Sequence, residues 1–229
     1  MTTETHVGYV LHRRPWRESS LLIDLLSASG SRLGAVARGV SSRRGWQGCL
    51  QPFRPLRVEL TGKSELRSLR AAEEHGPAVG LVGERLYCGF YLNELLVRLL
   101  ARNDPHDGLF AIYEQALQAL PSAPHAGVPL RYFELQLLQQ LGYGLQLQYD
   151  ADSGEPLRPE QRYEFGLETG PRAVRGERGY AGDSLLALAG QRLETLVQRR
   201  EARLLLQQAL KPHLGERPLH SRRLMRRSG

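Results

Sequence analysis

The first 75 residues contain five short segments that are apolar or alternate between apolar and polar residues, and no helical period separates them. The clearest is 53–61, where Leu56, Val58 and Leu60 alternate with charged or polar neighbours. The other four segments are 7–13, 20–26, 32–38 and 66–72. A period of two predicts strands with one buried face, and turn-forming residues separate the segments. Five such strands favour a small closed barrel of the oligonucleotide-binding (OB) type, with a small sandwich as the alternative.

The pattern changes near Gly76-Pro77, where helical periodicity begins. It predicts helices over 81–101, 107–120, 129–141, 182–189 and 192–210. In the last of these we expect an inward face made of Leu193, Leu196, Val197, Leu204 and Leu206. Residues 145–181 have neither period and are rich in glycine and proline, which predicts an irregular β-rich insertion. The predicted fold is therefore α+β, with an OB barrel over 1–76 and a helical bundle domain over 77–229. The insertion, about 145–181, and a basic tail, 211–229, belong to the helical domain.

Positive charge is concentrated at the two ends of the chain. Residues 1–75 hold 12 basic and 7 acidic residues, and residues 211–229 hold 6 and 1, whereas residues 76–210 hold 13 and 16. This distribution points to a polyanionic partner such as nucleic acid. The sequence has no long uncharged apolar run and no secretory signal, so we expect a cytoplasmic, nucleoid-associated protein without a membrane partner. The two cysteines match no metal or redox spacing and are expected to be free thiols.

A loop rich in arginine, serine and glycine, residues 38–48, lies between two of the predicted strands and contains no acid. Guanidinium groups bind phosphate oxygens in forked pairs, so the loop suits a phosphate backbone. The alternative is a solvated surface turn. Pro52-Phe53 after it fits a structural return into the barrel, and we expect Trp16 to pack in the core rather than to stack on bases. The candidate DNA-binding residues are Arg13, Arg14, Arg38, Arg43, Arg44, Trp46, Arg54, Arg57 and Lys63, with Arg222 and Arg223 from the tail.

The sequence contains partial matches to catalytic and metal-binding motifs, but each lacks a required residue. Gly62-Lys63-Ser64 lacks the earlier glycine of a phosphate-binding loop, because position 57 is arginine. Asp150-Ala151-Asp152 begins like a calcium loop, but its required glycine position holds Glu155. The histidines have no zinc spacing, and no Gly-x-Ser-x-Gly elbow is present. We therefore expect no enzyme activity and no cofactor.

Several blocks in a fixed order resemble the RecO family of bacterial DNA repair and recombination mediators. They are residues 10–22, 34–44, 50–56, 66–73, 91–96, 133–135, 141–145, 209–214 and 217–222. The resemblance implies an N-terminal OB domain followed by a helical domain with a zinc-finger-like insertion. It also implies binding of single- and double-stranded DNA, annealing of complementary strands, and work with RecR to load RecA onto strands coated by single-strand-binding protein.

Many members of that family hold zinc with four cysteines in the insertion, but residues 145–190 contain none, so we expect no metal here. The resemblance further implies docking of the C-terminal tail of single-strand-binding protein, a peptide that is acidic and ends in apolar residues. An apolar surface with arginines at its rim suits such a peptide. The candidate residues are Arg131, Arg199, Arg200, Arg203 and Leu204.

Two other functions remain open at this stage. In one, the protein is an adaptor that captures the peptide, and its contact with DNA is incidental. In the other, the barrel is an RNA-binding module. The basic tail could bind DNA, as proposed above, or it could be a disordered segment that keeps the protein soluble.

Overall fold

The computed structural model describes residues 3–39 and 46–225. The chain forms two compact units, one with residues 1–122 and 218–229 and the other with residues 123–217. The second unit is therefore inserted into the first along the chain. None of the helices in the described ranges is both long and apolar enough to span a membrane.

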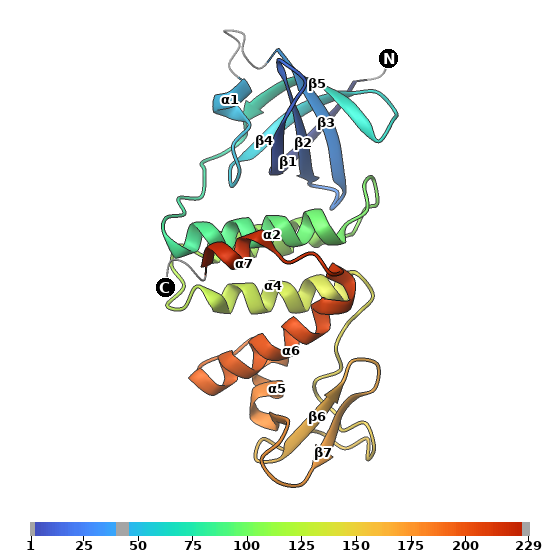
Figure 1. The fold of residues 1–229 in the computed structure, drawn as a ribbon, viewed down its shortest axis with the longest axis vertical. Helices are drawn as coiled ribbons and strands as arrows, with labels where there is room; N and C mark the ends of the chain where they lie inside the picture. Colours follow the sequence, from blue (N-terminus) through green and yellow to red (C-terminus); the bar gives the residue numbers. More distant parts are fainter. Residues whose placement is uncertain (1–2, 40–45, 226–229) are drawn as a thin grey trace. The chain divides into compact units, whose positions relative to one another are not determined.

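The first unit begins with a closed five-stranded barrel (Figure 1). Its strands are β1 (Thr3–Trp16), β2 (Ser20–Ser27), β3 (Arg32–Arg38), β4 (Pro55–Thr61) and β5 (Leu66–Glu74). Around the barrel their order is β1-β2-β3-β5-β4, with a parallel β3–β5 pair and antiparallel pairs elsewhere. This confirms the predicted barrel, and each expected strand is present.

Alternate side chains of the strands fill the barrel. The interior cluster consists of Val10, Ile23, Leu25, Leu33, Ala35, Ala37, Leu50, Leu56, Val58, Leu60 and Leu69. Burying these side chains supplies the main driving force for closing the sheet, at about 25 cal/mol for each Å² of apolar surface removed from water.

The segment between β3 and β4 returns the chain to the barrel. A short helix that the sequence did not predict, α1 (Trp46–Cys49), comes just before Leu50, which is fully buried. Phe53 is also buried, and its ring centroid lies 5.1 Å from that of Phe90. A Cβ at Gly89 would come within 2.9 Å of the Phe53 ring, so this contact needs glycine. Phe53 is thus a structural residue, as expected.

Three helices complete the first unit: α2 (Glu84–Leu99), α3 (Leu109–Ala119) and α7 (His220–Met225). Helix α2 packs on β1 and on α7. The Glu94 carboxylate of α2 accepts the backbone N–H groups of His220 and Ser221, both at 2.9 Å, and so caps the start of α7. Residue 76 therefore marks a change of secondary structure, whereas the compact units divide after residue 122.

The second unit combines helices with a small sheet. Its elements are α4 (Gly127–Gln140), β6 (Arg162–Gly166), β7 (Gly170–Val174), β8 (Tyr180–Ala181), α5 (Gly182–Ala189) and α6 (Leu196–Leu214). The three strands form one sheet in the order β7-β6-β8. They occupy the segment for which a β-rich insertion was predicted.

The expected inward face of the last long helix is wrong at three positions. Leu196, Val197 and Leu204 are exposed, with 73%, 56% and 48% of their surface accessible. The buried positions of α6 are Gln198, Ala202, Leu205, Leu206, Ala209 and Leu210. Leucines lie on both sides of this helix, so its periodicity did not decide which side packs. The helix begins at a capping box on Thr195, and packing against α5 and α4 sets its rotation.

A carboxylate holds the turn that precedes the small sheet. Asp150 is buried, and its Oδ1 accepts the backbone N–H groups of Asp152 and Ser153, both at 2.9 Å. Its Oδ2 accepts the backbone N–H of Ala173, in β7, at 2.8 Å. These hydrogen bonds keep the pKa of Asp150 below its usual range, and the bond from the Ser153 backbone has the largest effect. Burial acts in the opposite direction. Within the described ranges no cluster of His, Cys, Asp or Glu side chains fits a metal ion.

Asp150→Asn is expected to destabilise the second unit by about 2 kcal/mol at neutral pH, because the amide keeps only one acceptor oxygen. The pKa is lower in the folded protein than in the unfolded chain, so the carboxylate stabilises fully above about pH 4 and loses this effect as the pH falls through the folded pKa. Urea unfolding of both proteins at several pH values should show a difference that shrinks in acid. Asp152→Asn, at an exposed ion pair with Arg172, is the matched control and should have little effect. A difference that is independent of pH would contradict this role.

Candidate nucleic-acid interface

An irregularity in β1 decides which of its basic residues face outward. The pairing of β1 with β2 shifts between Val10 and His12, which leaves Leu11 as an extra residue. Such a β-bulge reverses the alternation of the strand beyond it. Arg14 therefore lies opposite Leu22 on the outer face, whereas Arg13 lies opposite Ile23, whose side chain is inside the barrel.

Two of the predicted DNA-binding arginines, Arg14 and Arg38, lie on this outer face together with Trp16. Trp16 lies opposite Ser20, and Ser20 lies opposite Arg38, so the three form one row across β1, β2 and β3. Arg14 is two residues before Trp16 and thus on the same face. The Arg14 guanidinium carbon lies 5.8 Å from the centroid of the Trp16 ring. We use the name outer row for Arg14, Trp16 and Arg38, of which Trp16 and Arg38 lie in this cross-strand row and Arg14 lies beside it on β1.

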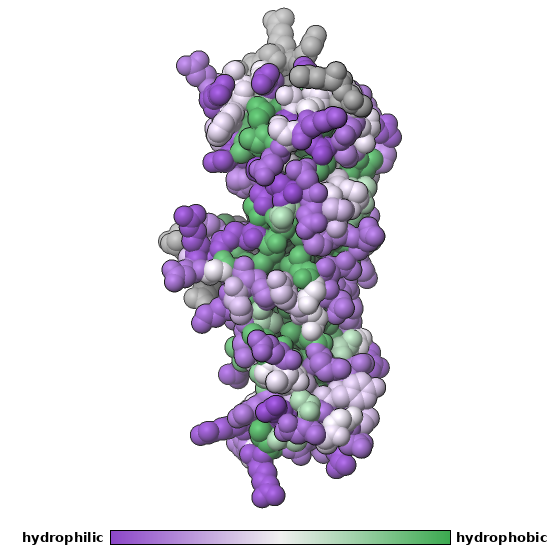
Figure 2. Space-filling view, turned by 90° about the vertical axis from the view of Figure 1, so that its right-hand side faces the viewer, coloured by the Kyte–Doolittle hydropathy of each residue, from purple (hydrophilic) through white to green (hydrophobic). Residues whose placement is uncertain are grey.

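The charges of the outer row are not neutralised by neighbouring carboxylates. Arg14 and Arg38 are both exposed, and neither forms an ion pair with any residue that the structure describes. Hydrophilic side chains cover most of the face of the barrel seen in Figure 2. The strand 2–3 face and the β1–β2 loop are where OB folds bind oligonucleotides, and the outer row occupies this position.

A side chain from α2 fixes the bulge. Asn93 Nδ2 donates to the carbonyl oxygens of Leu11 at 3.0 Å and of Val10 at 3.4 Å. The Tyr113 hydroxyl of α3 donates to Asn93 Oδ1 at 2.7 Å. All four residues are buried. These bonds satisfy carbonyl groups that the irregular pairing turns away from the strand ladder.

The other predicted barrel residues lie elsewhere or have partners. Arg13 is exposed, and its Nη1 donates to the carbonyl oxygen of Leu50 at 3.2 Å. Lys63 is exposed in the β4–β5 turn; because Leu66 pairs with Gly34, this turn lies at the other end of β3 from Arg38. These two residues are thus not part of the outer row.

Arg54 and Arg57 are compensated by acids of the neighbouring strand. Arg54 forms an ion pair with Glu74, and Arg57 forms one with Glu73 at 3.0 Å. The β4–β5 register brings these groups together, which periodicity in β4 alone does not reveal. A carboxylate next to an arginine offsets its positive charge, so the arginine attracts a phosphate less strongly.

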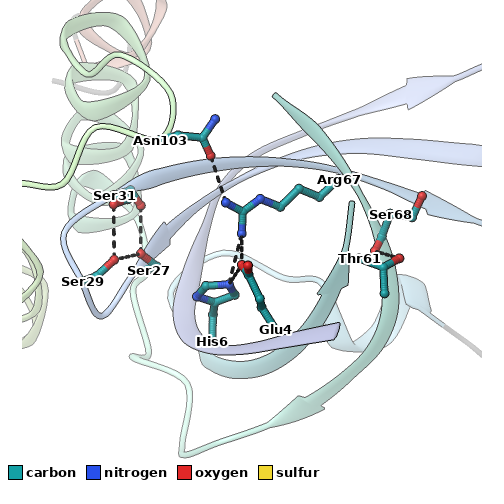
Figure 3. A network of polar contacts seen from close by, with 9 residues as sticks. All are labelled: Glu4, His6, Ser27, Ser29, Ser31, Thr61, Arg67, Ser68 and Asn103. Atoms are coloured by element: carbon teal, nitrogen blue, oxygen red, sulfur yellow. Dashed lines mark hydrogen bonds and ion pairs between the residues drawn. The ribbon is translucent and has the colours of Figure 1, made fainter. Parts of the chain in front are cut away.

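Further arginines that the sequence did not distinguish hold the barrel to the helices. Arg67 Nη1 lies 2.6 Å from Glu4 Oε2, and its Nη2 donates to Asn103 Oδ1 at 3.3 Å; Figure 3 shows this guanidinium directed toward both side chains. The buried Asp24 carboxylate pairs with Arg32 at 2.8 Å and with Arg102 at 3.1 Å. Their contacts give these arginines a structural role.

Arg43 and Arg44 lie outside the described residues. Trp46 begins α1, but its side chain lies outside the described part, and the same holds for the side chain of Arg223. Arg222 packs on α2: its Nη2 donates to the Tyr91 hydroxyl at 3.0 Å, and its guanidinium carbon lies 5.4 Å from the centroid of that ring. The tail is thus helical over 220–225 rather than a disordered segment there.

Of the residues predicted to bind the peptide, one is buried and the others lie on α6. Arg131 is buried on α4, where its Nη2 lies 2.7 Å from the buried Glu134 carboxylate. It is therefore wrong as a surface contact, because the packed face of α4 turns it inward. On α6, Arg200, Arg203 and Leu204 are exposed, and Arg199 is half-buried with a hydrogen bond to the carbonyl oxygen of Glu194.

The charge of the chain divides sharply between the two units. Residues 1–122 and 218–229 contain 19 basic and 12 acidic residues, a balance of +7, whereas residues 123–217 contain 12 of each. The whole net charge of +7 therefore belongs to the unit that carries the outer row.

The observed fold and the family models indicate the same class of protein. A closed β1-β2-β3-β5-β4 barrel followed by helices defines an α+β protein with an N-terminal OB fold. The family model of the recombination protein O N terminus matches residues 1–77, and that of its C terminus matches residues 81–223. The chain belongs to the RecO family of DNA repair proteins.

Curated relatives support the same assignment over nearly the whole chain. The DNA repair protein RecO of Alkalilimnicola ehrlichii is 47% identical over 225 residues, which cover 96% of this chain and 89% of the relative. The corresponding protein of Methylococcus capsulatus is 44% identical and covers 96% and 92%. That of Haemophilus influenzae strain 86-028NP is 40% identical and covers 98% and 96%.

Proposed function

We propose that this protein is a recombination mediator that binds single- and double-stranded DNA without sequence specificity. It anneals complementary strands, and with RecR it helps to load RecA onto strands coated by single-strand-binding protein. Membership of the RecO family supports this proposal. The observation that carries it is the outer row on the OB face, in which the uncompensated Arg14 lies over an aromatic ring and the uncompensated Arg38 lies two strands away from that ring.

The proposed chemistry is electrostatic. Annealing requires two strands to approach while the repulsion between their phosphates is screened. Arginine contacts to phosphates provide affinity and leave base edges accessible, because phosphate contacts carry no sequence information. The first unit holds the entire net positive charge and so suits this task.

The salt dependence of binding tests the electrostatic mode. With about five phosphate contacts to a single strand, the logarithm of the affinity should fall with a slope of about −3.5 against the logarithm of salt concentration. Affinity should then fall roughly a hundredfold between about 50 and 200 mM salt. Fluorescence anisotropy of a labelled oligonucleotide measures this slope. A flat response contradicts the proposal, and tighter binding to RNA than to DNA of the same sequence favours the RNA-binding alternative.

A second candidate function, peptide capture, rests on the exposed side of α6. Leu196, Val197 and Leu204 expose apolar surface there, and Arg200 and Arg203 lie on the same helix without an ion-pair partner in the described chain. An acidic peptide that ends in apolar residues matches both features. We propose that this surface, without Arg131, docks the tail of single-strand-binding protein.

A further inference from the structure

Trp16 does not belong to the core of the barrel. It is the last residue of β1, beyond the bulge, where the alternation places it on the outer face. The interior cluster does not include it, and its side chain is half-buried. We expected this tryptophan to be a core residue, and its position shows that expectation to be wrong.

The Trp16 indole has a cation over its ring and a small residue across the strand pair. The Arg14 guanidinium lies over the ring at 5.8 Å, a cation–π contact that restricts the indole. The residue across the strand pair is Ser20, which is small, and Arg38 follows on the next strand. Two strand spacings separate Trp16 from Arg38, about 10 Å in a β-sheet. The indole therefore has one cation near it along β1, Arg14, and a second one across the sheet, Arg38.

We infer that Trp16 is a base-stacking residue that gives the barrel a preference for single-stranded over double-stranded DNA. This inference rests on the proposed function. An unpaired base stacks on the indole while Arg14 and Arg38 contact the flanking phosphates. The bases of a duplex are stacked on one another and do not reach the ring, so duplex DNA gains only the phosphate contacts. Stacking uses the π-face that every base has, and it therefore adds affinity without sequence specificity.

Affinity measurements on Trp16→Leu and Trp16→Phe test the preference. The leucine variant should bind oligothymidylate roughly 5- to 150-fold more weakly, the usual range for loss of one stacked base, and duplex DNA within about twofold of the wild type. The phenylalanine variant keeps an aromatic face and should retain most of the preference, which separates stacking from packing. Tyr149→Leu, which removes an exposed aromatic ring from the second unit, is the matched control and should change neither affinity.

Fluorescence gives a second readout, because the chain has two tryptophans. In Trp46→Phe, Trp16 is the only tryptophan, and excitation at the red edge of the absorption band selects it over the tyrosines. Oligothymidylate should quench it, whereas an abasic phosphodiester of equal length should bind without quenching.

The outcomes separate this inference from the proposed function. If single strands bind with the expected salt dependence but Trp16→Leu leaves the ratio of single-strand to duplex affinity unchanged, the stacking role is overturned and the DNA-binding function stands. Equal quenching by the abasic polymer also overturns it. If the wild-type protein binds neither form of DNA, the proposed function fails first. The ratio is measured in the wild-type background, so it does not depend on the behaviour of Trp46→Phe.

Discussion

Replacing both Arg14 and Arg38 by glutamine is expected to weaken single-strand binding about 60-fold at about 50 mM salt. Each phosphate contact to a single strand contributes about 0.7 to the salt slope, which corresponds to about eightfold in affinity at this concentration. The slope should become shallower by about 1.4, and the defect should shrink to about threefold near 500 mM salt. Anisotropy titrations at several salt concentrations measure both quantities.

Arg57→Gln is the matched control, because it removes one arginine charge from the same barrel. Its guanidinium is paired with Glu73, so we expect less than about a threefold loss of affinity at the same salt concentration. Equal losses for Arg57→Gln and for either outer-row arginine would contradict the distinction between compensated and uncompensated arginines.

The reciprocal variant Leu204→Glu separates DNA binding from peptide capture. It should prevent binding of a synthetic acidic peptide with an apolar end and leave the affinity for bare single strands unchanged, because Leu204 belongs to α6 and not to the barrel. The double outer-row variant should behave in the opposite way. If that double variant still anneals bare strands at the wild-type rate, the adaptor alternative is correct.

Asn93→Leu is expected to destabilise the first unit by about 3 to 5 kcal/mol. The substitution leaves the carbonyl groups of Val10 and Leu11 and the hydroxyl of Tyr113 buried without their partner. Each unsatisfied buried polar group costs about 1 to 3 kcal/mol. For a chain of this size the melting temperature should fall by roughly 6 to 20 °C. Thermal unfolding followed by circular dichroism measures the change.

Tyr113→Phe provides the graded comparison. It removes one hydrogen bond to Asn93 and should cost only about 1 to 2 kcal/mol. The double variant should lose less than the sum of the two, because both side chains belong to one network. A stability of Asn93→Leu within about 1 kcal/mol of the wild type would show that Asn93 does not hold the bulge.

Local patterns predicted the elements of this fold well. The alternation in 53–61 anticipated β4, and the helical pattern over 182–189 anticipated α5. The prediction of the packed side of α6 was wrong, since its leucines surround the helix and packing against α4 and α5 chooses among them. Arg131 was misplaced for the same reason: an arginine in a helical pattern looks solvated until its partner Glu134 is seen to be buried with it.

The candidate site was only partly visible in the sequence. Arg14 and Arg38 were among the predicted contacts, but so were Arg54 and Arg57, and residue type does not distinguish the two pairs. The β4–β5 register brings Glu73 and Glu74 to the second pair. Trp16 was expected in the core, because nothing in the residues around Leu11 indicates that one of them is extra to the strand pairing.

The five strands, the change to helices near residue 76 and the basic character of the two ends could be predicted from the residues alone. These properties depend on residues close together in the chain, where the periods of strand and helix and the sum of charges are already present. Three other properties depend on how the folded chain packs: the face of β1 that carries Arg14 and Trp16, the arginines that remain without an acidic partner, and the unit that holds the net charge of +7. A bulge held by Asn93 from α2 reverses the alternation of β1. That contact joins residues 82 positions apart, and it exists only when the barrel and the helix have packed.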